Sequence, residues 1–247
     1  MKIDVLTIFP EMFEVIIKAS IFGKAVEKGI IRVKIHDIRE YATNKHKQVD
    51  DYPYGGGHGM VMSPQPLFDA MYSILDQDSS GKRQVIYFSP RGTVLNQHIA
   101  ASFTNCEHMI LICGHYEGID QRVIDRFVDH EVSIGDYVLT GGELPAMVFM
   151  DCVCRLLPGV LGNPLSANDE SFSRGLLEYP QYTRPQTYEG LEVPEVLLSG
   201  NHKQIERFKT TESIKVTLSR RPDLICSATL TSSEKICLED IMKDQYT

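Results

Sequence analysis

The chain has 247 residues, 43% of them hydrophobic, and a formal net charge of −8. This length and apolar content suffice for one large domain or two smaller ones, which excludes a chain that is disordered throughout. The acidic total argues against a protein that simply coats nucleic acid, although local basic patches can still steer binding.

The first half of the chain alternates predicted strands and helices. The β-branched runs at 2–9 and 30–36 predict strands, and Pro10 suits the first turn of a helix between them. The first run contains Asp4 and ends at Pro10, so it is too short for a signal peptide or a membrane span. After the glycine loop at 54–60 we expect helices at 66–75, 96–106 and 120–127, and a strand at 84–88. The pattern predicts an α/β fold.

Three predicted strands end in loops that contain glycine. QVIYF at 84–88 stops at Ser89-Pro90-Arg91-Gly92, MILIC at 109–113 runs into GHYEGID, and EVSI at 131–134 runs into GDYVLTGGELPA. Bare glycine backbone allows close approach of a flat ligand, and ligands of open α/β sheets collect beyond the carboxyl ends of the strands. The three loops therefore predict one cofactor pocket, unless the glycines serve only as turns.

The second half of the chain predicts a domain boundary. The segment at 144–157 is apolar almost all round, which indicates a helix buried in a core or against a second subunit. Residues 162–175 are small and polar, as is typical of a mobile functional loop. We expect an α/β domain at 1–161, this linker at 162–175, and a helical domain at 176–247, with helices starting after Asn201 and at a capping box from Thr231 to Glu234.

The glycine spacings restrict the ligand. The chain has neither the GxGxxG spacing of a dinucleotide site nor the GK[ST] ending of a phosphate loop, so a pyrophosphate ligand is disfavoured. S-adenosylmethionine, which carries an adenosine and a sulfonium but no phosphate, fits better. The six cysteines form no CxxC pair, which favours reduced thiols over zinc. We expect no structural metal site and a cytoplasmic protein; the residues do not decide whether magnesium is needed.

Three runs in order, GHYEGID at 114–120, VSIGDYVLTGGELPA at 132–146 and YPQYTRP at 179–185, resemble bacterial tRNA (guanine-N1)-methyltransferases of the SPOUT class. The glycine loop at 54 and LLSGNH at 197–202 also match, so the resemblance covers nearly the whole chain. It implies a mostly parallel sheet with a deep trefoil knot, a helical carboxyl-terminal domain, and a homodimer with the active site at the subunit interface. It also implies methylation of N1 of the guanine directly 3′ of the anticodon.

The resemblance assigns S-adenosylmethionine to residues of the three loops. Tyr116 and Glu117 would lie beside the cofactor, the backbone from Ile134 to Leu139 around its adenine, and Asp136 near the sulfonium or in support of the loop. The full expected set is Tyr87, Ser89, Pro90, Gly114, Tyr116, Glu117, Gly118, Ser133, Ile134, Gly135, Asp136, Tyr137, Val138, Leu139, Gly141, Gly142 and Pro145.

The reaction itself calls for a base and a cation. Guanine N1 carries a proton at neutral pH, so methyl transfer requires that proton to leave while negative charge grows on O6. The resemblance places the base directly before Ser171, at Glu170, where many relatives carry Asp; Asp169 is its neighbour and stays the alternative. It matches Arg155 to the cation, although an arginine at a helix end can also interact simply with the helix dipole.

Two basic patches are either solvated faces or contacts to RNA phosphates. One gathers Arg32, Lys34, His36, Arg39, Lys45, His46 and Lys47; the other gathers His202, Lys203, Arg207, Lys209, Lys215, Arg220 and Arg221. We expect Tyr182, Arg184, Lys203 and Arg207 to contact tRNA. Two other readings remain: a SPOUT methyltransferase acting on ribose or another base, and a non-catalytic RNA-binding protein of the same fold.

Overall fold

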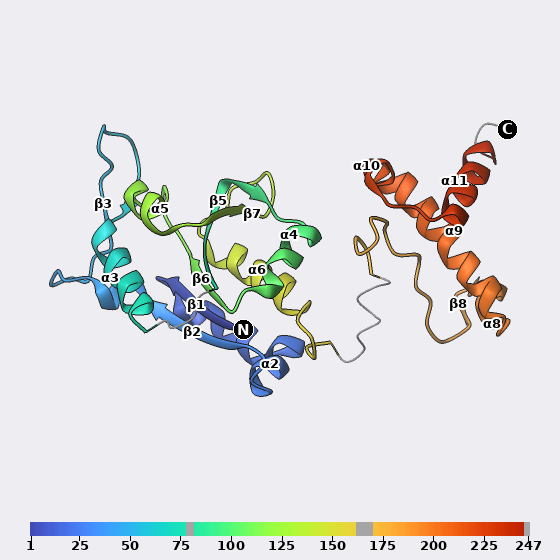
Figure 1. The fold of residues 1–247 in the computed structure, drawn as a ribbon, viewed down its shortest axis with the longest axis horizontal. Helices are drawn as coiled ribbons and strands as arrows, with labels where there is room; N and C mark the ends of the chain where they lie inside the picture. The colour runs from blue at the N-terminus through green and yellow to red at the C-terminus, as the bar shows by residue number, and fades with distance from the viewer. Residues whose placement is uncertain (78–81, 162–169, 245–247) are drawn as a thin grey trace. The chain divides into compact units, whose positions relative to one another are not determined.

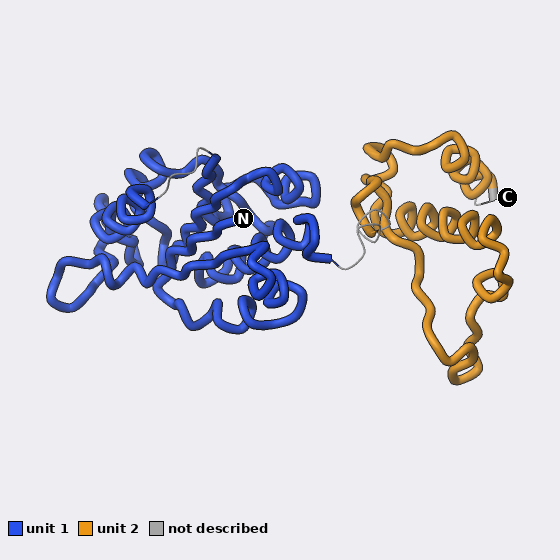
Figure 2. Tube along the Cα trace, turned by 60° about the horizontal axis from the view of Figure 1, so that its bottom comes forward, with its two compact units in different colours: residues 1–162 blue, residues 163–247 orange. Residues whose placement is uncertain are grey.

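The computed structural model describes residues 1–77, 82–161 and 170–244. The chain divides into two compact units, Met1–Gly162 and Asn163–Thr247 (Figure 2). The first part of the expected linker, 162–169, lies outside the described residues, and Asp169 lies there as well. No helix in the described ranges is long and apolar enough to cross a membrane.

The first unit is built on a five-stranded sheet whose paired strands are all parallel. The strands are β1 (Lys2–Thr7), β2 (Arg32–Asp37), β5 (Arg83–Val94), β6 (His108–Ile112) and β7 (His130–Ser133), in the order β2-β1-β6-β5-β7 (Figure 1). Strands of such sheets are usually covered on both faces, which explains why the apolar run of the central strand β6 is buried at every position. The expected α/β fold with a mostly parallel sheet is confirmed.

Helices cover both faces of this sheet (Figure 1). Because side chains alternate along a strand, Ile3 and Val5 of β1 pack into one core and Leu6 into the other. The first core receives η1 (Pro10–Phe13), α1 (Glu14–Lys18), α2 (Ser20–Glu27), α4 (Gln97–Ser102), η3 (Phe103–Asn105) and α6 (Glu143–Cys154). The second receives η2 (Ile38–Tyr41), α3 (Pro64–Leu75) and α5 (Gln121–Phe127).

Local capping explains where two of these helices begin. The side chain of Asn96 accepts a 2.9 Å hydrogen bond from the backbone N–H of Ile99, and Asp120 accepts one of 2.9 Å from the backbone N–H of Arg122. Both caps satisfy amide donors that have no partner inside the helix. The expected starts near 96 and 120 are confirmed, although the first helix tightens into the 3-10 turn η3 before it ends.

The prediction that the strand at 84–88 stops at Ser89 was wrong. β5 continues to Val94, and its pairing with β7 shifts because Phe88 and Thr93 both lie opposite Val132. The intervening residues form a bulge, which lets a loop project from a strand without ending it. Gly92 is required at its base because an added Cβ would lie 2.5 Å from the backbone of Glu131.

The second unit is helical but also contains extended segments. It comprises the hairpin β8 (Thr187–Tyr188) and β9 (Leu191–Glu192), followed by α8 (Glu195–Leu198), α9 (His202–Arg220), α10 (Pro222–Ser227) and α11 (Ser232–Asp244). The expectation of helix throughout 176–247 therefore missed the hairpin. The small buried core of the second unit consists of Leu176, Ile214 and Ile241. Asn201 caps α9, and the capping box of Thr231 and Glu234 is confirmed.

Candidate active site

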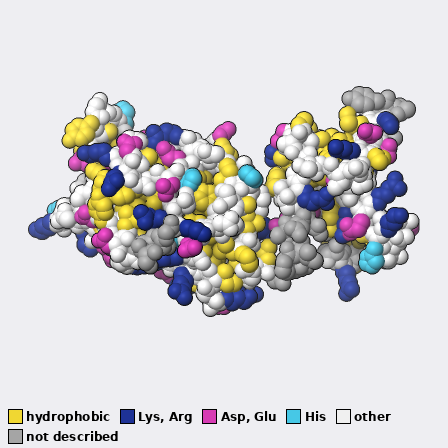
Figure 3. All heavy atoms as spheres, in the orientation of Figure 1, with side chains coloured by type: hydrophobic (Ala, Val, Ile, Leu, Met, Phe, Trp, Pro, Cys, Tyr) yellow, Lys and Arg dark blue, Asp and Glu magenta, His cyan; other side chains and the backbone are white. Residues whose placement is uncertain are grey.

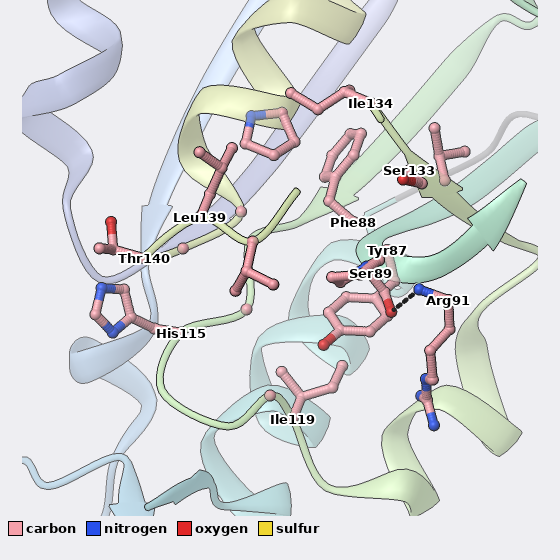
Figure 4. Close-up of a pocket in the computed structure, with 18 of the residues that line it drawn as sticks. Tyr87, Phe88, Ser89, Arg91, His115, Ile119, Ser133, Ile134, Leu139 and Thr140 are labelled. Carbon is pink, nitrogen blue, oxygen red and sulfur yellow. Dashed lines mark hydrogen bonds between the residues drawn. The ribbon is translucent and has the colours of Figure 1, made fainter. Parts of the chain in front are cut away.

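A cavity of about 410 Å³ opens at the carboxyl ends of β5, β6 and β7 (Figure 4). This volume is within the range of small-molecule sites. His115 and Thr140 lie at one side of the cavity, and Ser89 and Arg91 at the other (Figure 4). The walls come from the β5 bulge, from the loop after β6 and from the loop between β7 and α6. The three segments that the sequence singled out thus meet at one place.

Backbone hydrogen bonds join two of these loops. The N–H of Gly142 donates a 2.8 Å bond to the carbonyl of Gly114, and His115 forms an antiparallel bridge with Gly141. Gly142 has no room for a side chain, because an added Cβ would lie 2.8 Å from Cys113 Cα and 2.9 Å from Gly114 N. The glycines are therefore more than turns: they let two backbones touch at the floor of the cavity.

Tyr87 belongs to β5, and its side chain packs against the loop that follows β6. Its hydroxyl lies against Gly114 and Gly118, at 3.0 and 3.3 Å from the positions that Cβ atoms would take there. Burial raises the pKa of Tyr87 above its ordinary value. Next in the loop, Tyr116 has a φ of +60°, a left-handed conformation that is uncommon outside glycine. Such conformations persist where the surrounding structure imposes them, often at binding sites.

Beneath the cavity, a buried hydrogen bond connects the start of α6 to β1. Thr7 Oγ1 donates to Glu143 Oε1 at 2.8 Å. Thr7 Oγ1 also accepts a 2.9 Å hydrogen bond from the N–H of Phe9. Glu143 is only 2% exposed and occupies the first turn of α6, where the helix dipole favours a negative charge. Burial, with the Glu143 charge adding to it, raises the pKa of the neighbouring Cys113 thiol well above its usual value.

The glycine-rich loop at 54–60 approaches the cavity from the side. It lies between β3 (Asp50–Asp51) and β4 (Val61–Met62), and the backbone N–H of Glu117 donates a 3.0 Å bond to the carbonyl of Met60. An added Cβ at Gly59 would lie 2.6 Å from Glu117 Oε1. Glycine at this position therefore makes room for the Glu117 side chain at the rim of the cavity.

Every residue of the expected cofactor set except Asp136 lines the cavity. Asp136 belongs to the same loop but is absent from the lining, so only its backbone neighbours Gly135 and Tyr137 face the site. The sequence interpretation missed several lining residues, of which His115 and Thr140 stand directly beside predicted glycines and could have been found by adjacency. The missed residues are Phe88, Arg91, His115, Ile119, Gln121, Val132 and Thr140.

The lining suits a ligand held by backbone groups and apolar walls. Ile134, Val138, Leu139 and Pro145 supply apolar surface, and Glu117 supplies a carboxylate at the rim. His115 Nδ1 is buried with no hydrogen-bond partner among the described residues. The bare backbone at 141–142 forms a cradle that side chains would fill. A phosphate-free ligand such as S-adenosylmethionine fits these groups.

The expected catalytic residues belong to different units. Arg155 is the C-cap of α6, half-buried, and its backbone N–H bonds the carbonyl of Asp151 at 3.1 Å. Glu170 belongs to the second unit, where it lines a small cavity with Arg174 and Glu178. Arg155 and Glu170 therefore come from separate units of the chain.

The four residues expected to contact tRNA are exposed and lie in the second unit. Tyr182 and Arg184 lie in the extended segment before β8. Lys203 and Arg207 lie one turn apart on α9, so they share a face of that helix.

The two basic patches carry less exposed and unpaired positive charge than the sequence alone suggests. His36 is buried and hydrogen-bonded to both Asp4 and Tyr41, so counting it in the first patch was wrong: its ring lies between these two side chains instead of facing solvent. In the second patch, Lys209 pairs with Glu206 and Lys215 with Glu212. Figure 3 shows acidic side chains among the basic ones on the visible face.

An open parallel sheet with a glycine-lined cavity at its carboxyl edge defines an α/β cofactor-binding protein. A family model described as tRNA (Guanine-1)-methyltransferase TrmD matches residues 1–227. The chain belongs to this family.

Individual relatives extend the match to almost the full chain. The chain is 55% identical over 245 residues to the tRNA (guanine-N(1)-)-methyltransferase of Halalkalibacterium halodurans, covering 99% of both chains. It is 54% identical to the protein of that name from Moorella thermoacetica, covering 98% of this chain and 97% of the relative. The Pediococcus pentosaceus protein of the same name is 54% identical, with 98% of each chain covered.

Proposed function

We propose that this protein transfers a methyl group from S-adenosylmethionine to N1 of the guanine directly 3′ of the anticodon in tRNA. The observation that carries the proposal is the meeting of three loops around one glycine-lined cavity, in a chain of the tRNA (guanine-1)-methyltransferase family. A tRNA substrate also favours a cytoplasmic site of action.

S-adenosylmethionine would be held by the residues that line this cavity. The backbone of Ile134 to Leu139 would surround the adenine, and Tyr116 and Glu117 would lie beside the rest of the cofactor. Bound there, it supplies an electrophilic methyl group on a cationic sulfonium. The Glu117 carboxylate at the rim suits that positive charge, and Ile134, Leu139 and Pro145 supply apolar contact surface.

The chain's own residues would manage the proton and the charge on guanine. Glu170 would accept the N1 proton, and the guanidinium of Arg155 would stabilise the negative charge that grows on O6. Asp169 remains the alternative base. Glu170 would then hold the proton as a carboxylic acid, while N1 carries the methyl group that the bound cofactor would supply.

A homodimer would bring these two residues together, with Arg155 from the first unit of one copy and Glu170 from the second unit of its partner. The apolar helix α6 supports this assembly. One face of it is buried in the core, whereas Leu144 and Val148 on the other remain 49% and 43% exposed. Exposed apolar side chains on an ordered helix favour a protein interface. A well-folded, active monomer in a sedimentation measurement would contradict this assembly.

We also propose that the first unit carries the trefoil knot of the SPOUT class. The loop after edge strand β7 returns to Gly114 at the end of β6, where Gly142 bonds it, and Glu143 beyond it reaches Thr7 of β1. This return to β6 and β1 supports the proposal, since a knot requires the chain to pass back through a loop formed earlier in the sequence.

The second unit would bind the tRNA through Tyr182, Arg184, Lys203 and Arg207. Contacts of the cationic side chains to phosphates would weaken as salt increases, whereas selection of the base would depend on an unstacked guanine entering the site. Enzymes that modify a base edge commonly flip the base outward, and we expect the same here.

Two measurements test the proposed function. Calorimetry with S-adenosylmethionine separates an enzyme from an RNA-binding scaffold, because a scaffold has no need to bind it. Mapping the methylated nucleotide on unmodified tRNA then separates this activity from that of other SPOUT enzymes. A methyl group found on a ribose, or on any base atom other than guanine N1, would overturn the proposal.

A further inference from the structure

The segment that carries Glu170 is a closed turn within the second unit. Ser173 bonds the Glu170 carbonyl twice, through its hydroxyl at 2.7 Å and its N–H at 3.2 Å. The N–H of Phe172 donates to the carbonyl of Leu176 at 2.8 Å, and Phe172 itself has a φ of +74°. Residues 170–176 therefore have a defined conformation, and the direction of Glu170 depends on how this turn is fixed to its surroundings.

One attachment is to α9. The N–H of Leu177 donates a 2.9 Å hydrogen bond to Thr217 Oγ1, and Ser213 Oγ donates to the carbonyl of Leu177 at 2.5 Å. Thr217 is fully buried, and Leu176 packs in the small core beside Ile214. This attachment holds the end of the turn that is farther from Glu170.

The second attachment is to α11. Arg174 Nη2 donates a 2.8 Å hydrogen bond to Glu234 Oε1. The other carboxylate oxygen, Oε2, accepts 2.7 Å bonds from both the N–H and the hydroxyl of Thr231. Glu234 is 5% exposed, so one buried carboxylate both caps α11 and holds Arg174. The Arg174 side chain is 56% exposed, so the orientation of the pair comes from its Glu234 end, where the carboxylate is buried and held by three charge-assisted hydrogen bonds.

The ion pair of Arg174 and Glu234 lies near the side chain of Glu170. Arg174, Glu234 and Glu170 line the same cavity of about 90 Å³ in the second unit. The family model ends at residue 227, whereas α11 begins at Ser232, so the pair joins a residue inside the matched region to one beyond it.

We propose that the pair of Arg174 and Glu234 is a positioning clamp, by which α11 holds the turn that presents Glu170 to the guanine. The inference rests on the proposed function, in which Glu170 is the base. It adds a role in catalysis for the last helix of the chain. Arg174 and Glu234 are positioning residues and take no part in the proton transfer.

Single-turnover methylation, with tRNA and S-adenosylmethionine both saturating, tests the clamp. Arg174→Met keeps the aliphatic stem but removes the charge, and Glu234→Gln keeps an acceptor for Thr231 while weakening the ion pair. We expect each variant to lower the rate roughly tenfold, since small displacements of a reacting group are costly. KM for tRNA and the affinity for S-adenosylmethionine should stay unchanged. Arg174→Lys should recover part of the rate.

Two controls separate positioning from stability. Glu212→Gln removes the charge from a 2.9 Å ion pair with Lys215 in the same unit, and should leave the rate unchanged. Because Arg174 and Glu234 would act as a unit, the double variant Arg174→Met with Glu234→Gln should be no slower than either single variant. Amide exchange at 171–177 should accelerate in Arg174→Met while exchange in α9 does not.

The outcomes distinguish the clamp from the proposed function. If the wild type does not methylate guanine N1, the proposed function fails. If it does, and folded Arg174→Met reacts at the wild-type rate, the clamp is wrong. A rate loss that only follows the loss of folded protein, or a rise in KM for tRNA with an unchanged rate, would also overturn it.

Discussion

The hydroxyl of Thr7 donates a 2.8 Å hydrogen bond to the buried carboxylate of Glu143, 136 positions further along the chain. Thr7 ends β1 and Glu143 begins α6, directly after the glycines that line the cavity. The bond therefore fixes the glycine loop to β1, an interior strand of the sheet.

Thr7→Val should weaken S-adenosylmethionine binding severalfold and lower the free energy of unfolding by about 1–3 kcal/mol, the cost of leaving a buried acceptor without its donor. Calorimetry and denaturant unfolding measure the two effects. Thr7→Ser keeps the hydroxyl and should stay near the wild type in affinity. Equal affinity in Thr7→Val would mean that the loop holds its shape without this bond.

The two glycines that face each other across the floor should differ in their tolerance of alanine. In Gly142→Ala the added Cβ meets the backbone of Cys113 and Gly114, whereas in Gly114→Ala it meets side chains, Tyr87 at 2.9 Å and Ile119 at 3.4 Å. We expect Gly142→Ala to lose S-adenosylmethionine binding and about 1–3 kcal/mol of stability through overpacking. Gly114→Ala should lose less affinity for S-adenosylmethionine and less unfolding free energy, as measured by calorimetry and denaturant unfolding. The reverse order would contradict the close approach at Gly142.

Glu170→Gln should reduce turnover at least 100-fold, about the least that a general base contributes. Binding of S-adenosylmethionine should stay within about twofold, because the proposed role of Glu170 is to accept the guanine proton and glutamine keeps the size of the side chain. Rates and calorimetry on the same preparations check both points. Asp169→Asn is the matched comparison and should retain most activity. If it is the inactive variant instead, the base is Asp169.

Asp4 is a buried carboxylate between two histidines. Its two oxygens lie 2.6 Å from His36 Nε2 and 2.6 Å from His108 Nε2, and Lys2 Nζ lies 2.9 Å away. Burial alone would raise the pKa of Asp4, but the hydrogen bonds from His108, His36 and Lys2 outweigh it and hold the pKa well below its usual range. Asp4→Asn should cost about 3 kcal/mol of unfolding free energy at neutral pH, as for other broken buried pairs.

The pH dependence of that cost follows from the direction of the shift. A carboxyl whose pKa is lower in the folded state stabilises the fold above its unfolded pKa of about 3.9, and loses this contribution as the pH falls further. The difference between wild type and Asp4→Asn in denaturant unfolding should therefore narrow below about pH 4. A constant difference down to pH 2 would show that the Asp4 charge is not what stabilises this centre.

Some of the site could be predicted because its signals are local. The apolar runs of β6 and β7 each end at a segment that contains glycine. Glycine at the end of a strand usually marks a turn or a place where another backbone or a ligand comes close. The cap at Asn96 and the box of Thr231 and Glu234 also involve residues within three or four positions. By contrast, the bulge in β5 depends on pairing with Val132, which no pattern within residues 84–94 reveals.

By itself, the sequence determined the alternation of strands and helices, the absence of phosphate-binding glycine spacings, and the motifs that place the chain in its family. Only the tertiary structure decided which polar groups became partners: Thr7 with Glu143, Asp4 with His36 and His108, and Arg174 with Glu234. The physical reason is that propensity, periodicity and capping act over a few residues. Pairing across 60 or 136 positions depends on strand register and helix packing, which the whole fold sets together.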